Sequence, residues 1–352
     1  MANELKLGLN TGYWAGGPPP GVTDTIAEAE RLGYDSMWTA EAYGSDCLTP
    51  LAWWGASTTR IRLGTAIVQI SARQPAATAM AAMTMDHLSS GRFILGLGVS
   101  GPQVVEGWYG RPFAKPLART REYIGILRDI WARRGPLTND GPHYPLPLPD
   151  GTGLAKPLKA SIHPLREEIP IFLGAEGPKN IAMCAELCDG WLAMLFSPEH
   201  QDLYLDPLKE GFAREGARRS LEEFEIAATV PLVLTDDVEG AIDAVRPFYA
   251  LYFGGMGAKG ANFHANVPIR MGYEKEILEI QDLYLAGKKE EACRAIPDAL
   301  IDLVSLVGPR GQVAERLAAY RDAGVGTLLA SPLGFSREQQ LEQMRTLAEL
   351  AA

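Results

Sequence analysis

The sequence has few cysteines and histidines, and neither type forms a recognisable metal or disulfide pattern. Four cysteines are scattered through 352 residues, and no two of the five histidines have the spacing of metal ligands. No apolar stretch is long enough to span a bilayer, and the N-terminus lacks a basic segment followed by an apolar run. These absences predict a protein of the reducing cytoplasm, without a metal site, disulfides or a membrane span.

The sequence also lacks an excess of positive charge. It contains 33 basic and 43 acidic residues, which gives a formal net charge of −10. Nucleic acids and anionic membranes bind basic surfaces, so neither is an expected partner. No Ser-His-Asp or nucleophile-elbow pattern is present, which disfavours acyl transfer.

Short apolar runs alternate with helical patterns along the whole chain. With 47% hydrophobic and 22% charged residues, the chain has the composition of a globular protein with a large core, and we treat residues 1–352 as one domain. The alternation predicts a parallel sheet, either closed into an eight-stranded (β/α)8 TIM barrel or open and doubly wound. Eight strands are expected, near Leu5–Asn10, Tyr34–Trp38, Ile61–Val68, Arg92–Gly98, Ile169–Gly174, Gly190–Met194, Glu225–Leu234 and Thr327–Ser331.

Two segments exceed what a minimal barrel needs. Residues 135–168 contain seven prolines, which disfavour a regular helix or a central strand. Residues 253–307 begin with a glycine-rich run, after which helices are expected around Ile277–Leu283 and Pro297–Leu306. Because long loops are uncommon unless functional, we expect both segments to be insertions at the C-terminal mouth of the barrel.

The most informative stretch runs from Gly91 to Glu122. Its buried strand ends in Gly96-Leu97-Gly98-Val99-Ser100-Gly101, which matches the dinucleotide-binding pattern G-x-G-x-x-G. That fingerprint requires a helix at its third glycine, whereas residues 102–116 read as a loop. It also requires an acid at the end of the next strand, whereas Glu122 lies in a helical pattern. The sequence therefore disfavours a Rossmann site.

The same region carries a family resemblance. Ser89-Ser90-Gly91-Arg92, Leu95-Gly96-Leu97-Gly98 and the segment from Ser100 to Trp108 resemble the bacterial luciferase-like superfamily. The resemblance covers nearly the whole chain. It is nearest to the coenzyme F420-dependent oxidoreductases, which include methylenetetrahydromethanopterin reductase. It implies a TIM barrel, a homodimer, and hydride transfer between a deazaflavin and a small organic substrate.

The resemblance also implies site residues. Glu41, just past the second strand, is the expected catalytic residue, which either moves a proton or fixes the polar edge of the ring. A non-proline cis peptide is expected at Ala66–Ile67, behind the ring. The full set of expected cofactor-binding residues is Thr39, Ala66, Ile67, Gln69, Ser100, Gly101, Gln103, Gly174, Ala175, Glu176, Gly177, Pro178, Lys179 and Met194.

The turn from Gly174 to Asn180 has an independent physical argument. Pro178 suits the first position of a helix, and the exposed amides of a helix start bind phosphate. Lys179 adds a positive charge, so the turn is expected to hold the tail or phosphate of the cofactor. Glu176 argues against a close approach of phosphate, because relatives often have a small residue there.

Several alternatives remain open from the residues alone. An FMN-dependent monooxygenase of the same fold, a non-catalytic flavin carrier, and a barrel aldolase or isomerase are the rival functions. Glu41 has a plain reading as a loop ion pair. Arg73 and Gln74 would either meet a polyglutamate tail or lie in a solvated loop. His264 would touch substrate, and the Trp53-Trp54 pair would lie in a subunit interface or in the core.

Overall fold

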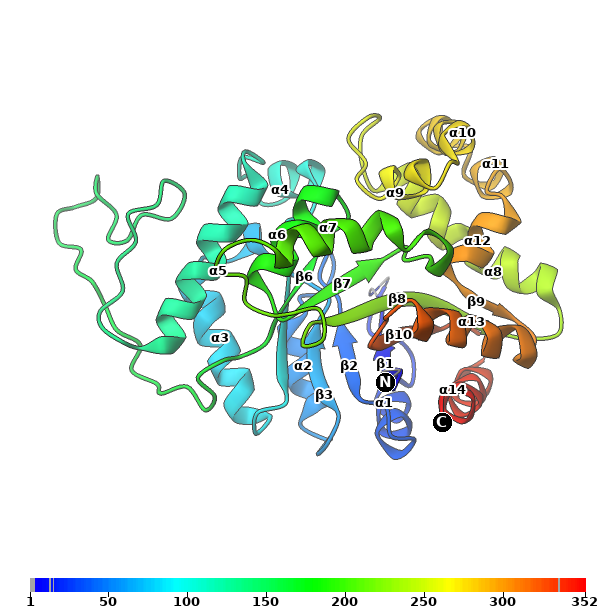
Figure 1. The fold of residues 1–352 in the computed structure, drawn as a ribbon, viewed down its shortest axis with the longest axis horizontal. Coiled ribbons are helices and arrows are strands. Elements are labelled where there is room, and N and C mark those ends of the chain that lie inside the picture. The colour runs from blue at the N-terminus through cyan, green and yellow to red at the C-terminus, as the bar shows by residue number, and fades with distance from the viewer. Residues whose placement is uncertain (1–3, 13, 15, 335) are drawn as a thin grey trace.

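The protein folds as a closed parallel barrel (Figure 1). The computed structural model describes residues 4–12, 14, 16–334 and 336–352. Strand β10 pairs with both β1 and β8, which closes the sheet and confirms the barrel over the open alternative. The barrel strands are β1 (Lys6–Asn10), β2 (Ser36–Thr39), β3 (Arg62–Thr65), β5 (Phe93–Gly98), β6 (Ile171–Gly174), β7 (Gly190–Met194), β8 (Glu225–Leu234) and β10 (Thr327–Pro332).

Helices cover the outside of the barrel, as the alternating pattern predicts. They are α1 (Val22–Arg31), α2 (Leu48–Gly55), α3 (Pro75–Leu88), α5 (Pro116–Ala132), α6 (Pro178–Leu187), α7 (Asp202–Phe212), α13 (Arg310–Asp322) and α14 (Arg337–Ala351). Cys184 and Cys188 are fully buried against the sheet, as core residues. Within the described residues, no helix is long and apolar enough to cross a membrane.

Large side chains fill the barrel interior. Trp38 and Phe172 face each other there, with ring centroids 5.7 Å apart. Trp38 fits because its neighbour on β3 is Gly64, where an added Cβ would lie 2.2 Å from the indole ring. The interior is therefore a packed core, and a ligand has to bind at its end.

The third strand is interrupted where the resemblance places the cis peptide. Instead of one strand over Ile61–Val68, β3 ends at Thr65 and a short β4 (Val68–Gln69) follows, with the 3₁₀ turn η1 (Ile70–Ala72) after it. The Ala66–Ile67 peptide bond between the two strands is cis. This prediction is confirmed.

The loop expected over residues 102–116 is partly wrong. Helix α4 (Pro102–Gly107) opens directly after Gly101, so the glycine pattern does lead into a helix. The helix is only six residues long, and Glu122 lies within α5 rather than at a strand end. The Rossmann arrangement is therefore excluded because the sheet closes into a barrel. The presence of helix α4 does not change this conclusion.

The first insertion does not lie at the C-terminal mouth, contrary to our expectation. Residues 133–170 connect α5 to β6, so they run between a helix and the next strand, and Figure 1 shows them as the long loop beside α5. Glu122 of α5 fixes the loop by accepting hydrogen bonds from Asn139 Nδ2 and from the backbone N–H groups of His143 and Tyr144. The segment is irregular, as its prolines predict.

The second insertion does lie at the mouth and begins earlier than expected. It leaves the carboxyl end of β8 as α8 (Val238–Ala250) and continues through the π-helical turn η3 (Leu251–Gly255), α9 (Asn266–Arg270), α10 (Glu274–Leu285), α11 (Lys289–Arg294) and α12 (Asp298–Val304). It ends in β9 (Leu306–Gly308), a strand that the sequence analysis missed, which pairs with the end of β8.

Candidate active site

The tips of β4, β5 and β6 meet around Ile67. A Cβ placed on Gly98 would lie 2.6 Å from Ile67 Cδ1, and one placed on Gly174 would lie 3.3 Å from Ile67 Cγ2. Ala66 and Ile67 are themselves half-buried against the barrel interior. The side chain of Ile67 therefore fills the space beside both glycines, and the three strand tips pack closely at the end of the barrel where catalytic groups lie in this fold.

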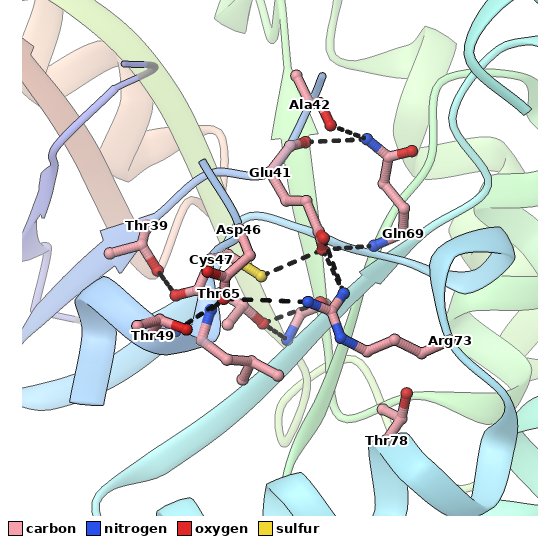
Figure 2. A network of polar contacts seen from close by, with 12 residues as sticks. Thr39, Glu41, Ala42, Asp46, Cys47, Thr49, Thr65, Gln69, Arg73 and Thr78 are labelled. Carbon is pink, nitrogen blue, oxygen red and sulfur yellow. Dashed lines mark hydrogen bonds and ion pairs between the residues drawn. The ribbon is translucent and has the colours of Figure 1, made fainter. Parts of the chain in front are cut away.

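Glu41 lies at the tip of β2 in a dense polar network (Figure 2). Its side chain is only 5% exposed, and Arg73 Nη1 lies 2.8 Å and 2.7 Å from its two carboxylate oxygens. The backbone N–H of Gln69 and the thiol of Cys47 also donate to this carboxylate. Both oxygens are thus engaged by the protein. Arg73 faces Glu41 and does not extend toward solvent.

Neighbouring groups are held in fixed charge states by this network. Burial, followed by the charge of Glu41, raises the pKa of Cys47 well above its ordinary value, so the thiol stays neutral. Burial opposes the charge of Arg73, but the hydrogen bonds and charge of Glu41 raise its pKa overall. Burial and the same carboxylate raise the pKa of Tyr109, which follows α4 and which the sequence analysis did not single out.

Gln69 offers an acceptor that the described structure leaves unused. Its amide nitrogen donates to the carbonyls of Glu41 and Ala42, at 3.2 Å and 3.3 Å. These two bonds fix the amide, and its Oε1 is buried without a hydrogen-bond partner among the described residues. Because buried acceptors are nearly always satisfied, this oxygen suits an N–H donor of a bound ligand.

The loop after β5 carries three of the predicted residues, and Gln103 Oε1 lies 3.3 Å from the Cβ position of Gly101. Ser100 takes a left-handed conformation (φ 59°), and Gly101 lies below the second insertion, where its Cβ position is 3.9 Å from Met256 O. Gln103, on α4, is exposed. At other strand tips, Met194 ends β7 half-buried, whereas the buried Thr39 donates its hydroxyl to Cys47 O.

The turn after β6 is built as the sequence predicts, but its charges differ from the expected anion site. Pro178 is the first residue of α6, and Gly177 O accepts from Asn180 and Ile181. Glu176 Oε1 lies 2.5 Å from His264 Nδ1, and Arg270 donates to Glu176 O. The carboxylate therefore joins the turn to the second insertion.

Lys179 does not join the mouth. It lines a separate cavity of about 600 Å³ on the outer surface, together with Leu117 and Arg121 of α5 and Glu210 of α7. The turn thus provides the start of helix α6, but it lacks the lysine that the sequence analysis assigned to it. In the described part of the chain, no cluster of three or more His, Cys, Asp or Glu side chains is arranged to hold a metal ion.

Comparisons with known proteins agree with this architecture. The sequence profile of luciferase-like monooxygenases matches residues 8–327. A Mycobacterium tuberculosis protein described as a candidate coenzyme F420-dependent oxidoreductase is 56% identical over 352 residues, which cover 99% of this chain and 100% of that protein. The 5,10-methylenetetrahydromethanopterin reductase of Archaeoglobus fulgidus is 28% identical, over 89% of this chain and 90% of its own length. The solved structure of the F420-dependent tetrahydromethanopterin reductase of Methanopyrus kandleri has a TM-score of 0.77 at 23% identity and covers 97% of both chains.

Proposed function

The chain belongs to the luciferase-like monooxygenase family, and we propose that it is a coenzyme F420-dependent oxidoreductase that acts on a small organic substrate. The observation that carries this function is the 56% identity, over 99% of this chain, to a protein described as an F420-dependent candidate. The 28% identity to a methylenetetrahydromethanopterin reductase supports the same branch of the family. The enzyme class follows from both.

The residues at the mouth fit a flat, polar-edged ring. When bound, F420 supplies a ring carbon that accepts or donates a hydride. The half-buried Ile67, packed against Gly98 and Gly174, offers one face of such a ring an apolar support. Gln69 Oε1, buried and unpartnered among the described residues, accepts a hydrogen bond from an imide N–H of the ring edge.

Glu41 acts through the network around it. Its carboxylate accepts from Arg73 and from the Gln69 backbone, so it holds the loop that carries Gln69 in place. Of the two roles that the resemblance allows, we assign it the fixing of the polar edge. The contacts of its carboxylate with Arg73, Cys47 and the backbone of Gln69 support this positional role.

The assembly and location belong to the same proposal. Trp54 of α2 is buried near Trp14, with ring centroids 5.9 Å apart, whereas the adjacent Trp53 is 78% exposed. We assign Trp53, with the exposed Met80 of α3, to the interface of a homodimer, because an exposed indole is typical of interfaces. All four cysteines are free thiols, which fits the reducing cytoplasm.

Cofactor binding separates this function from its FMN rival. The purified cofactor-free protein is titrated with F420 and, separately, with FMN, and binding is followed by the fluorescence of each pigment. We expect F420 to bind and FMN to bind much more weakly. Tight FMN binding without F420 binding would reverse the assignment. F420 binding without turnover across a screen of alcohols, imines and enones would favour a carrier instead.

A further inference from the structure

The first insertion carries a segment, residues 145–159, that its own chain leaves largely uncovered; we call this segment the arm. Every residue from 148 to 159 is exposed. In the part of the chain that the structure describes, residues 147–157 make no backbone hydrogen bond to a residue outside this range. Figure 1 shows the loop that carries the arm to project beyond α3 and α5, away from the barrel. The arm therefore gains little stabilisation from its own fold to offset the entropy of ordering it.

The arm is apolar although it is exposed. Leu148, Leu154 and Leu158 are 60%, 85% and 68% exposed. Single exposed apolar side chains are ordinary on a protein surface, but three on one short uncovered segment are typical of a site that binds another molecule. The arm also carries two exposed cations, Lys156 and Lys159. It therefore offers an apolar contact flanked by positive charge.

The chain is anchored to the barrel on both sides of the arm. After the arm, Arg166 donates to the fully buried carboxylate of Asp86, near the end of α3, and to Phe93 O. Before the arm, Tyr144 packs edge-on against Tyr123 of α5, with ring centroids 5.6 Å apart. Both anchors lie within this chain, so a partner has only to cover the arm that projects between them.

The anchors of the arm lie beside the surface that we assign to the homodimer. Trp53 of α2 and Met80 of α3 are the exposed side chains of that surface. Helix α3 packs between α2 and α5. Tyr123, on which one anchor packs, shares a hydrogen bond with Thr78 of α3, and Asp86 of the same helix holds the other anchor. Helix α3 therefore connects the homodimer surface with the base of the arm.

We propose that the arm lies against a second copy of this chain, at the edge of the homodimer surface. This inference rests on the homodimer of the proposed function. A partner on α2 and α3 is already adjacent to the base of the arm, which favours a second copy over an unrelated protein. Twofold symmetry makes the contact twice, once from each arm. The charges agree, because residues 148–159 carry two lysines and one aspartate, whereas the whole chain has a net charge of −10.

Photocrosslinking tests the contact directly. The photoreactive residue p-benzoylphenylalanine replaces Leu154 in the full-length protein, which is irradiated and run on a denaturing gel. We expect a band of twice the chain mass, which comes only from a link between two copies. The same residue in place of Leu278, exposed on α10, is the matched control and should give no such band. A dimeric protein that gives no intermolecular crosslink from position 154 would overturn the proposal.

A second test measures the strength of the dimer by sedimentation equilibrium. We expect the double variant Leu154→Ser with Leu158→Ser to raise the dimer dissociation constant at least about tenfold, because each arm loses two apolar contacts. The double variant Leu278→Ser with Leu285→Ser, which changes two exposed leucines of α10, is the control and should keep the wild-type constant. An arm variant that dissociates no more readily than the wild type would refute the contact.

The outcomes separate this inference from the proposed function. A monomeric wild type would remove the proposed homodimer and the arm contact together. A dimeric wild type that fails either test above would remove the arm contact alone. F420 titration reports on the enzymatic assignment, and we expect the arm variant to bind F420 within about twofold of the wild type, because the arm lies outside the barrel mouth. If the arm variant loses F420 binding, it is misfolded, and the crosslink from position 154 decides.

Discussion

The hydroxyl of Thr65 bridges both backbone polar groups of Gly96. It donates to Gly96 O and accepts from Gly96 N, each at 2.9 Å. A Cβ on Gly96 would lie 1.7 Å from the carbonyl oxygen of Thr65. Strands β3 and β5 thus approach here as closely as backbone allows, because β5 has glycine at this position.

Gly96→Ala should therefore destabilise the fold by about 3 kcal/mol or more, since the clash is with backbone that cannot move aside cheaply. Urea unfolding measures this change. Gly125→Ala is the control: Gly125 is exposed within α5, with nothing within 4 Å of an added Cβ, and this change should stabilise by about 0.5–1 kcal/mol. Equal effects at the two positions would contradict the close approach.

Arg73→Met should lower the free energy of unfolding by about 3–5 kcal/mol, because it leaves the buried carboxylate of Glu41 without its cation. The double variant Arg73→Met with Glu41→Gln should recover much of that loss, since the uncompensated charge is removed. Chemical denaturation of the two single variants and the double variant gives the coupling energy. If the changes in unfolding free energy of the two single variants simply add in the double variant, the interaction between Arg73 and Glu41 does not contribute to stability.

Gln69→Met should weaken F420 binding about tenfold, which corresponds to the loss of one hydrogen bond of about 1.4 kcal/mol. A deazaflavin methylated on its imide nitrogen should lose a similar factor with the wild type but little with Gln69→Met. Fluorescence titration of both proteins with both ligands measures this cycle. If methylation costs the same affinity in both proteins, Gln69 does not accept from that nitrogen.

Acid should unfold the protein partly through Glu186. Hydrogen bonds from Arg121, opposed by burial, and from Arg214 lower the pKa of Glu186 from 4.5 to about 2. The unfolded chain therefore binds this proton at higher pH than the folded protein does. The stabilisation is complete above about pH 4.5 and is lost as the pH falls toward 2.

Glu186→Gln should flatten the loss of stability over this interval, measured by urea unfolding at a series of pH values. The control is Glu349→Gln, which removes an exposed ion pair with Arg310 and should change the profile little. An unchanged slope in Glu186→Gln would mean that this carboxyl titrates alike in the folded and unfolded states.

Trp53→Glu should convert the proposed homodimer to a monomer, because it places a charge in the centre of an apolar contact. Analytical ultracentrifugation measures the change. Leu88→Glu, at the exposed C-terminal end of α3, is a control that should keep the wild-type mass. A monomeric wild type would remove the interface.

The alternation of buried strands and helices was enough to predict the parallel sheet, because strand and helix periods are properties of local sequence. The motif from Ser100 to Trp108 further identified the family, and with it the closed barrel and the cis bond at Ala66–Ile67. Local signals also located Pro178 at the start of α6.

Only the tertiary structure decided which side chains meet. Glu41 and Arg73 are 32 residues apart, and Glu176 and His264 are 88 apart. No local pattern in a single sequence encodes such distances, because these contacts depend on how strand tips and the insertion come together. The same reason explains why Lys179, predicted at the mouth, lies at an outer cavity. A helix start is determined by local sequence, but the direction of a side chain from it depends on the packing of neighbouring helices.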